Sequence, residues 1–116
     1  MLDYIRIACA VPEVQVANVE KNTRDICDYM EKADAQNVDI VLFPELALTG
    51  YSCGDLFMQD ALLDAVEEGL AEILACSAKH PLLTAVVGLP VRSGMKLLNC
   101  AAVICDGKVR ELVSKS

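Results

Sequence analysis

A glutamate placed where an apolar strand ends is the residue of this chain best suited to acid–base chemistry. Residues 40–43 are apolar and mostly β-branched or aromatic, which is typical of a strand buried on both faces. Pro44 has no N–H to donate to a neighbouring strand, so Glu45 follows where the sheet opens into a loop. A carboxylate there is costly to desolvate unless it is paired, hydrated or used chemically, which makes Glu45 a candidate general base. The residues alone also allow an exposed loop carboxylate, or a cap for a helix that starts at Leu46.

Cysteine is the other residue type in this chain that could act as a nucleophile. The six cysteines show no C-x-x-C spacing and several lie in apolar segments: Cys9, Cys27, Cys53, Cys76, Cys100 and Cys105. We therefore expect reduced, buried thiols that act as small hydrophobes. Cys53, eight residues after Glu45, could be a nucleophile, but a loop cysteine more often packs than reacts. His80 is the only histidine and stands at a predicted helix end, so we expect a surface residue and no metal site.

Composition excludes several classes of function. With 116 residues and 54% apolar content, the chain is long enough for one domain with a core and too apolar for disorder. A net charge of -7 without a run of Lys or Arg argues against a nucleic-acid partner. No apolar stretch is long enough for a membrane span and the N-terminus carries no signal pattern, so we expect a soluble, cytoplasmic protein.

Hydrophobic periodicity predicts an α/β chain in the order β-α-β-α-β-β-β. Helical spacing predicts a helix from an Asn18 cap to about residues 36–37, and a second from about Asp60 to Ala78. Apolar runs predict strands at residues 4–10, 40–43, 83–89, 97–105 and 108–113. The dipeptide Asp106-Gly107 between the last two runs is a strong hairpin signal.

The segment around Glu45 also resembles a known family motif. The string FPELALTGYSCGDLF at residues 43–57 closely resembles the glutamate motif of the nitrilase, or carbon-nitrogen hydrolase, superfamily, in which a strand delivers a catalytic glutamate after Phe-Pro. Within that superfamily, LTGYS followed by GDLF is similar to the glutaminase domain of glutamine-dependent NAD synthetases. The resemblance implies the first half of an αββα sandwich.

The same resemblance assigns further site residues. Counting along GKVRELVSK at residues 107–115 puts Lys115 at the position of the family's catalytic lysine, although Ser114 stands where the family often has proline. By resemblance, Glu45 would deprotonate a thiol, and Lys115 would stabilise the oxyanion that forms on the way to a thioester. The family's nucleophilic cysteine is expected beyond Ser116. Tyr51 resembles a tyrosine of the glutamine pocket, or else covers the core.

The resemblance also implies a larger parent protein. Residues 1–116 would be the N-terminal part of one carbon-nitrogen hydrolase (glutaminase) domain, inactive alone and without a cofactor of its own. The parent would hydrolyse glutamine and pass the ammonia to a C-terminal synthetase domain, which uses ATP and Mg to amidate deamido-NAD. A homo-oligomer is expected. Two alternatives stay open, another amidase or carbamoylase of the superfamily and a non-catalytic interaction module.

Overall fold

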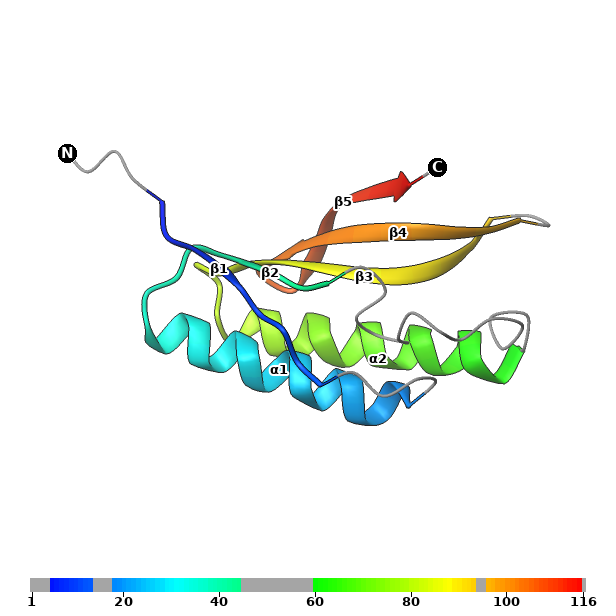
Figure 1. Cartoon of the computed structure of the whole chain (residues 1–116), viewed down its shortest axis with the longest axis horizontal. Helices are drawn as coiled ribbons and strands as arrows, with labels where there is room; N and C mark the ends of the chain where they lie inside the picture. Colours follow the sequence, from blue (N-terminus) through cyan, green and yellow to red (C-terminus); the bar gives the residue numbers. More distant parts are fainter. Residues whose placement is uncertain (1–4, 14–17, 45–59, 94–95, 116) are drawn as a thin grey trace.

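A mixed five-stranded sheet carries both helices on one of its faces (Figure 1). The computed structural model describes residues 5–13, 18–44, 60–93 and 96–115. Its elements are β1 (Ile7–Cys9), α1 (Val19–Ala35), β2 (Ile40–Leu42), α2 (Asp60–Ala78), β3 (Thr84–Ser93), β4 (Lys96–Cys105) and β5 (Lys108–Lys115). The predicted α/β class and the predicted element order are confirmed.

The order of strands in the sheet is the same as their order in the sequence. β1 pairs with β2 and β2 with β3 in parallel, whereas β3 pairs with β4 and β4 with β5 in antiparallel. Consequently β1, β2, β3 and β5 run in one direction and only β4 runs against them. The carboxyl ends of β2 and β5 therefore lie at the same edge of the sheet.

α1 forms where the sequence predicts it, because its cap and its apolar stripe agree. The Asn18 side chain accepts a hydrogen bond from the Lys21 backbone N–H at 3.1 Å, which satisfies one free donor of the first turn. Five positions at helical spacing are all buried, namely Val19, Thr23, Ile26, Met30 and Ala33. The helix stops at Ala35, two residues before Asn37, whose φ of 60° cannot continue an α-helix.

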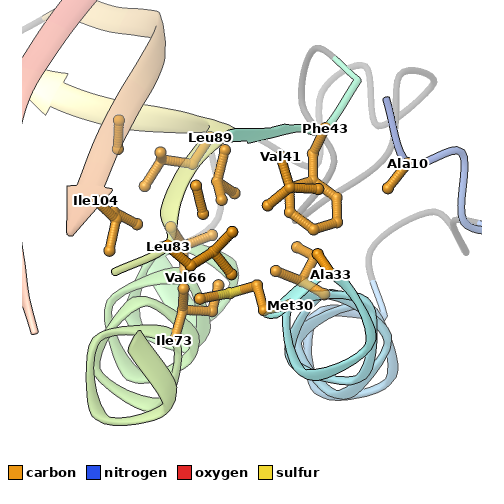
Figure 2. Close-up of a cluster of buried hydrophobic side chains, with 14 of the residues drawn as sticks. Ala10, Met30, Ala33, Val41, Phe43, Val66, Ile73, Leu83, Leu89 and Ile104 are labelled. Atoms are coloured by element: carbon orange, nitrogen blue, oxygen red, sulfur yellow. The ribbon is translucent and has the colours of Figure 1, made fainter. Parts of the chain in front are cut away.

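α2 lies beside α1, and together the two helices cover the core (Figures 1 and 2). Its bounds are those predicted, and Leu63, Val66 and Ile73 are buried. Figure 2 shows Val66 and Ile73 of α2 and Met30 of α1 in one cluster with three residues from the sheet side of the core: Leu83, just before β3, Leu89 of β3 and Ile104 of β4. The core is thus a single layer between two helices and one sheet face.

β3 runs four residues further than predicted and passes through Pro90. Pro90 pairs with Asn99 of β4. The Val86 carbonyl accepts from the Phe43 N–H at 3.0 Å, so Val86 points its backbone polar groups toward β2, and by alternation Pro90 does so as well. β2 ends at Leu42, before the level of Pro90. The N–H that Pro90 lacks is therefore not needed by any carbonyl of β2.

The predicted hairpin between β4 and β5 is confirmed. Asp106 and Gly107 have φ values of 50° and 76°, the left-handed pair that a two-residue type I′ turn needs. The turn packs against the end of α2, where the Gly107 N–H donates to the Ser77 hydroxyl at 3.2 Å. Ser77 is fully buried, so this contact ties the hairpin to the helix layer.

Among the described residues, none covers the sheet face opposite the helices. The register places Ile7, Leu42 and Val113 on that face, because the neighbouring positions Val41 and Ala102 point into the core. These three side chains are 60%, 37% and 48% exposed. Within the described residues, no helix is both long and apolar enough to cross a membrane.

Candidate active site

The carboxyl end of β2 is hydrogen-bonded and packed as far as Phe43, two residues before Glu45. The Phe43 N–H donates to Val86 of β3, and the Leu42 carbonyl accepts from Ala10 at 2.9 Å, so pairing continues on both sides of the strand. Phe43 is buried and meets the Tyr29 ring edge-on, with centroids 6.4 Å apart at 86°. These contacts fix the position of Phe43, from which the chain continues through Pro44 to Glu45.

Lys115 is the last residue of β5, where its backbone pairs with Asn99 of β4. Leu42 of β2 is level with Val86, Val103 and Glu111 on the successive strands. Glu45 follows Leu42 by three positions, and Lys115 follows Glu111 by four in the same direction. The carboxyl ends of β2 and β5 thus lie at one edge of the sheet, separated by β3 and β4, which is about 14 Å between backbones in a flat sheet.

The remaining candidate residues lie outside the described part of the chain. Glu45, Tyr51 and Cys53 belong to residues 45–59, and for Lys115 only the backbone is described. The catalytic roles of Glu45 and Lys115 and the pocket role of Tyr51 accordingly stay predictions.

The expectation of buried cysteines is wrong for most of the thiols that the structure describes. Only Cys100 is buried; Cys27, Cys76 and Cys105 are partly exposed and Cys9 is exposed. All five are free thiols, as predicted. The helix stripes place Cys27 and Cys76 beside the core positions Ile26 and Ser77, so they sit at the border of the core.

Two of these thiols have surroundings that disfavour a thiolate. Burial, followed by the neighbouring Cys76 thiol and the carboxylates of Glu72 and Asp28, raises the pKa of Cys27 to about 12. Burial alone raises the pKa of Cys100. Neither residue suits the role of an activated nucleophile, in agreement with the expectation that the nucleophile lies elsewhere.

His80 is not a free surface residue. Its Nδ1 lies 2.7 Å from Oδ2 of Asp34, and its side chain is 18% exposed. The pair joins the C-terminal ends of α2 and α1, a structural role that the sequence did not predict. In the described segments no cluster of three or more His, Cys, Asp or Glu side chains could hold a metal ion.

An apolar pocket of about 430 Å³ opens between the N-terminal half of α2, the second half of β3 and the first five residues of β5. Its lining is apolar apart from Asp64 and Glu67, with Leu63, Val66, Leu89 and Leu112 among its walls. The pocket offers few hydrogen-bond partners to a polar amide, so it does not by itself form a glutamine site.

Comparison with protein families shows the family to which the chain belongs. The model of the carbon-nitrogen hydrolase family matches residues 6–115, a range that includes Glu45 and Lys115. The chain belongs to the carbon-nitrogen hydrolase family. The predicted family is therefore confirmed.

Individual relatives of this carbon-nitrogen hydrolase chain agree on one class of enzyme. A glutamine-dependent NAD(+) synthetase of Mycobacterium tuberculosis (strain ATCC 25618 / H37Rv) is 35% identical over 114 residues, 97% of this chain and 16% of that protein. One from Xylella fastidiosa (strain Temecula1 / ATCC 700964) is 37% identical over 116 residues, 99% of this chain and 21% of that protein. The chain thus spans about a fifth or less of the length of these relatives.

Solved structures confirm the nitrilase-like fold. A glutamine-dependent NAD(+) synthetase from Cytophaga hutchinsonii superposes with a TM-score of 0.84 at 32% identity, covering 97% of this chain and 19% of that one. An amidase from Nesterenkonia sp. superposes with a TM-score of 0.84 at 20% identity, covering 96% of this chain and 42% of that one. The amidase shares the fold only.

Proposed function

We propose that this chain forms the first part of a glutaminase domain in a glutamine-dependent NAD synthetase. The observation that carries the proposal is the identity of 35% to 38% with such synthetases over almost the whole chain. This likeness extends through both predicted catalytic positions, Glu45 after β2 and Lys115 at the end of β5.

The proposed chemistry assigns one task to each of the two residues. The Glu45 carboxylate takes the proton of a cysteine thiol, the thiolate attacks the glutamine amide carbon, and Glu45 returns the proton to the departing ammonia. The Lys115 ammonium stabilises the oxyanion of the tetrahedral intermediate and keeps Glu45 ionised. The thiol belongs to a cysteine beyond Ser116, and water then releases glutamate from the thioester.

The rest of the reaction belongs to the parent polypeptide. A C-terminal synthetase domain would use ATP and Mg to activate deamido-NAD, which the ammonia then converts to NAD. The length of the relatives supports this arrangement, because the chain covers only 16% to 21% of them. The glutaminase part and the synthetase part would depend on each other only through ammonia.

The test is Glu45→Gln in the longer polypeptide encoded by the gene that carries this chain. We expect loss of glutamine-dependent NAD synthesis and near-normal synthesis from ammonium salts, because the base serves only amide hydrolysis. Glu20→Gln, an isosteric change at an exposed position on α1, is the matched control and should leave both rates unchanged.

Three results would contradict the proposal. Equal loss with both nitrogen sources would make Glu45 structural. A polypeptide that hydrolyses glutamine or another amide but makes no NAD would identify a different amidase of the family. A gene that encodes no polypeptide beyond these residues would favour a non-catalytic module.

A further inference from the structure

Two thiols meet across the interface of the two helices, although they stand 49 residues apart in the sequence. Cys27 lies in the middle of α1 and Cys76 in the last turn of α2. The Cys76 thiol donates to the Cys27 backbone carbonyl, with Sγ and O 3.8 Å apart. Figure 1 shows α1 and α2 side by side, which is the arrangement that brings the two residues together.

The thiol pair is accessible from outside. Both residues line a surface pocket of about 500 Å³ whose other walls are Glu31, Glu72, Ala75, Lys79 and His80. Each cysteine is only partly buried. A small molecule can therefore reach sulfur from solvent, which is not so for the buried Cys100.

The other uses of such a pair fit the structure less well. No third ligand completes a metal site here, since the described residues hold no suitable cluster of His, Cys, Asp or Glu. Simple packing would favour burial, as for Cys100, rather than the wall of an open pocket. Nucleophilic catalysis at neutral pH is disfavoured, because burial, then the Cys76 thiol, and then the carboxylates of Glu72 and Asp28 raise the pKa of Cys27 and so leave only slow thiol exchange.

We propose that Cys27 and Cys76 are a reversible modification site, at which oxidation forms a disulfide that links α1 to α2. A small disulfide is the oxidant. The Cys76 thiolate attacks it and releases a first small thiol. The Cys27 thiolate, which is opposed less once the Cys76 sulfur is held in the mixed disulfide, then attacks that disulfide and releases another. Two S–H bonds are replaced by one S–S bond, while the oxidant's disulfide is reduced to two thiols. The proposal is independent of the glutaminase function, because it rests only on the helix interface.

The cross-link would act on the segment that leads to Glu45. The loop closed by Cys27 and Cys76 contains β2 and residues 45–59. Holding both ends of this loop together restricts its unfolded and partly opened states. The disulfide would therefore limit separation of α1 from α2. Its formation would also show that the two helices are in contact.

The experiment uses the full chain, reduced and shown by circular dichroism to be helical. It is incubated with the disulfide of β-mercaptoethanol, which is uncharged and so is not repelled by Glu31 and Glu72. Remaining thiols are alkylated, and the chain is digested with trypsin and Glu-C, because trypsin alone leaves Cys53 and Cys76 on one peptide. We expect loss of two hydrogen atoms from the chain and one cross-linked peptide pair, Cys27 with Cys76, both reversed by dithiothreitol.

Single variants supply the controls. Cys27→Ser and Cys76→Ser should each abolish the cross-link and leave a mixed disulfide or a free thiol on the remaining cysteine. Cys105→Ser is the matched control, because it removes a half-buried thiol at another site and should keep the cross-link.

Oxidation of the unmodified chain in guanidinium chloride keeps the proposal testable even if a variant fails to fold. The folded chain should give one pair and the unfolded chain a mixture. The same mixture in both states, mixed disulfides alone at Cys27 and Cys76, or a preferred link from either of them to another cysteine would overturn the proposal.

Discussion

The position of Lys115 at the sheet edge depends on the pairing of β5 with β4. Its backbone is the last of β5 to pair with β4, opposite Asn99. One register shift already occurs earlier in this pair, at Val103/Ile104, where β5 carries an extra residue. Without that bulge every later position of β5 would pair one residue further along β4, so the bulge determines the register in which the backbone of Lys115 reaches the sheet edge.

We expect Lys115→Ala in the longer polypeptide to lower glutamine-dependent synthesis by about two to three orders of magnitude, through loss of oxyanion stabilisation. Synthesis from ammonium salts should be retained, and the loss should fall on kcat more than on KM. Lys108→Ala, at the exposed beginning of the same strand, is the control. A loss confined to KM would instead assign Lys115 to substrate binding.

Ionisation of the Cys27 thiol makes the stability of the helix interface depend on pH. Its pKa rises from 9.0 to about 12, first through burial and then through Cys76. Because the folded-state pKa is the higher one, the unfolded chain loses this proton first as the pH rises. The stabilising contribution is fully present below about pH 9 and is lost as the pH rises from 9.0 toward about 12.

We expect alkylation of Cys27 to show this shift directly. In the folded chain the labelling rate should still be rising at about pH 11, whereas in denaturant it should level off above about pH 9. Peptide mass spectrometry after timed labelling with iodoacetamide measures both profiles. Coincident profiles in the two states would mean that the helices do not shield Cys27.

At the scale of elements, the β4–β5 hairpin and α2 support each other. A Cβ added at Gly107 would lie 3.1 Å from the Ala78 Cβ, and the residue has a φ of 76°. The turn thus needs glycine for its backbone conformation and for its close approach to the helix. The buried Ser77 hydroxyl completes the contact.

We expect Gly107→Ala to lower the free energy of unfolding by about 1–2 kcal/mol, from the left-handed backbone alone, and by more if Ala78 cannot move. Urea denaturation followed by circular dichroism measures the loss. Lys108→Ala, one residue further on, should change stability by no more than about 0.5 kcal/mol. Equal effects of the two changes would show that the turn does not rest on α2.

At the scale of the whole molecule, one face of the sheet lacks cover within the described residues. Both helices pack on the other face (Figure 1). Ile7, Leu42 and Val113 therefore present apolar area to solvent on a single surface. Large apolar side chains exposed together on one sheet face are typical of surfaces that associate with another layer of protein.

We expect the isolated chain to self-associate through this open face. Analytical ultracentrifugation should show species larger than a monomer, and the double variant Ile7→Lys with Val113→Lys should shift them toward the monomer. Leu82→Lys is the control, because Leu82 is 87% exposed in the turn before β3. A monodisperse monomer that melts cooperatively would contradict this prediction.

Local patterns in the sequence were sufficient for the helices and for the last hairpin. The bounds of α2, the buried stripe of α1 and the Asp106-Gly107 turn all follow from short-range rules of capping, periodicity and backbone conformation. The family motif around Glu45 was equally local. β5 runs two residues beyond the predicted 108–113 and ends at Lys115, the position that counting along residues 107–115 gives for the family's lysine. These features need no knowledge of what lies next to them in space.

Tertiary structure decided the features that depend on neighbours. β3 can pass through Pro90 because β2 ends at Leu42, before the level of Pro90, so no carbonyl of β2 is left without the N–H that Pro90 lacks. Cys27 meets Cys76, and His80 meets Asp34, because α1 and α2 pack in one particular alignment. Sequence spacing cannot predict such pairs, since residues on two helices meet according to the offset and rotation between the helices, which the core as a whole determines.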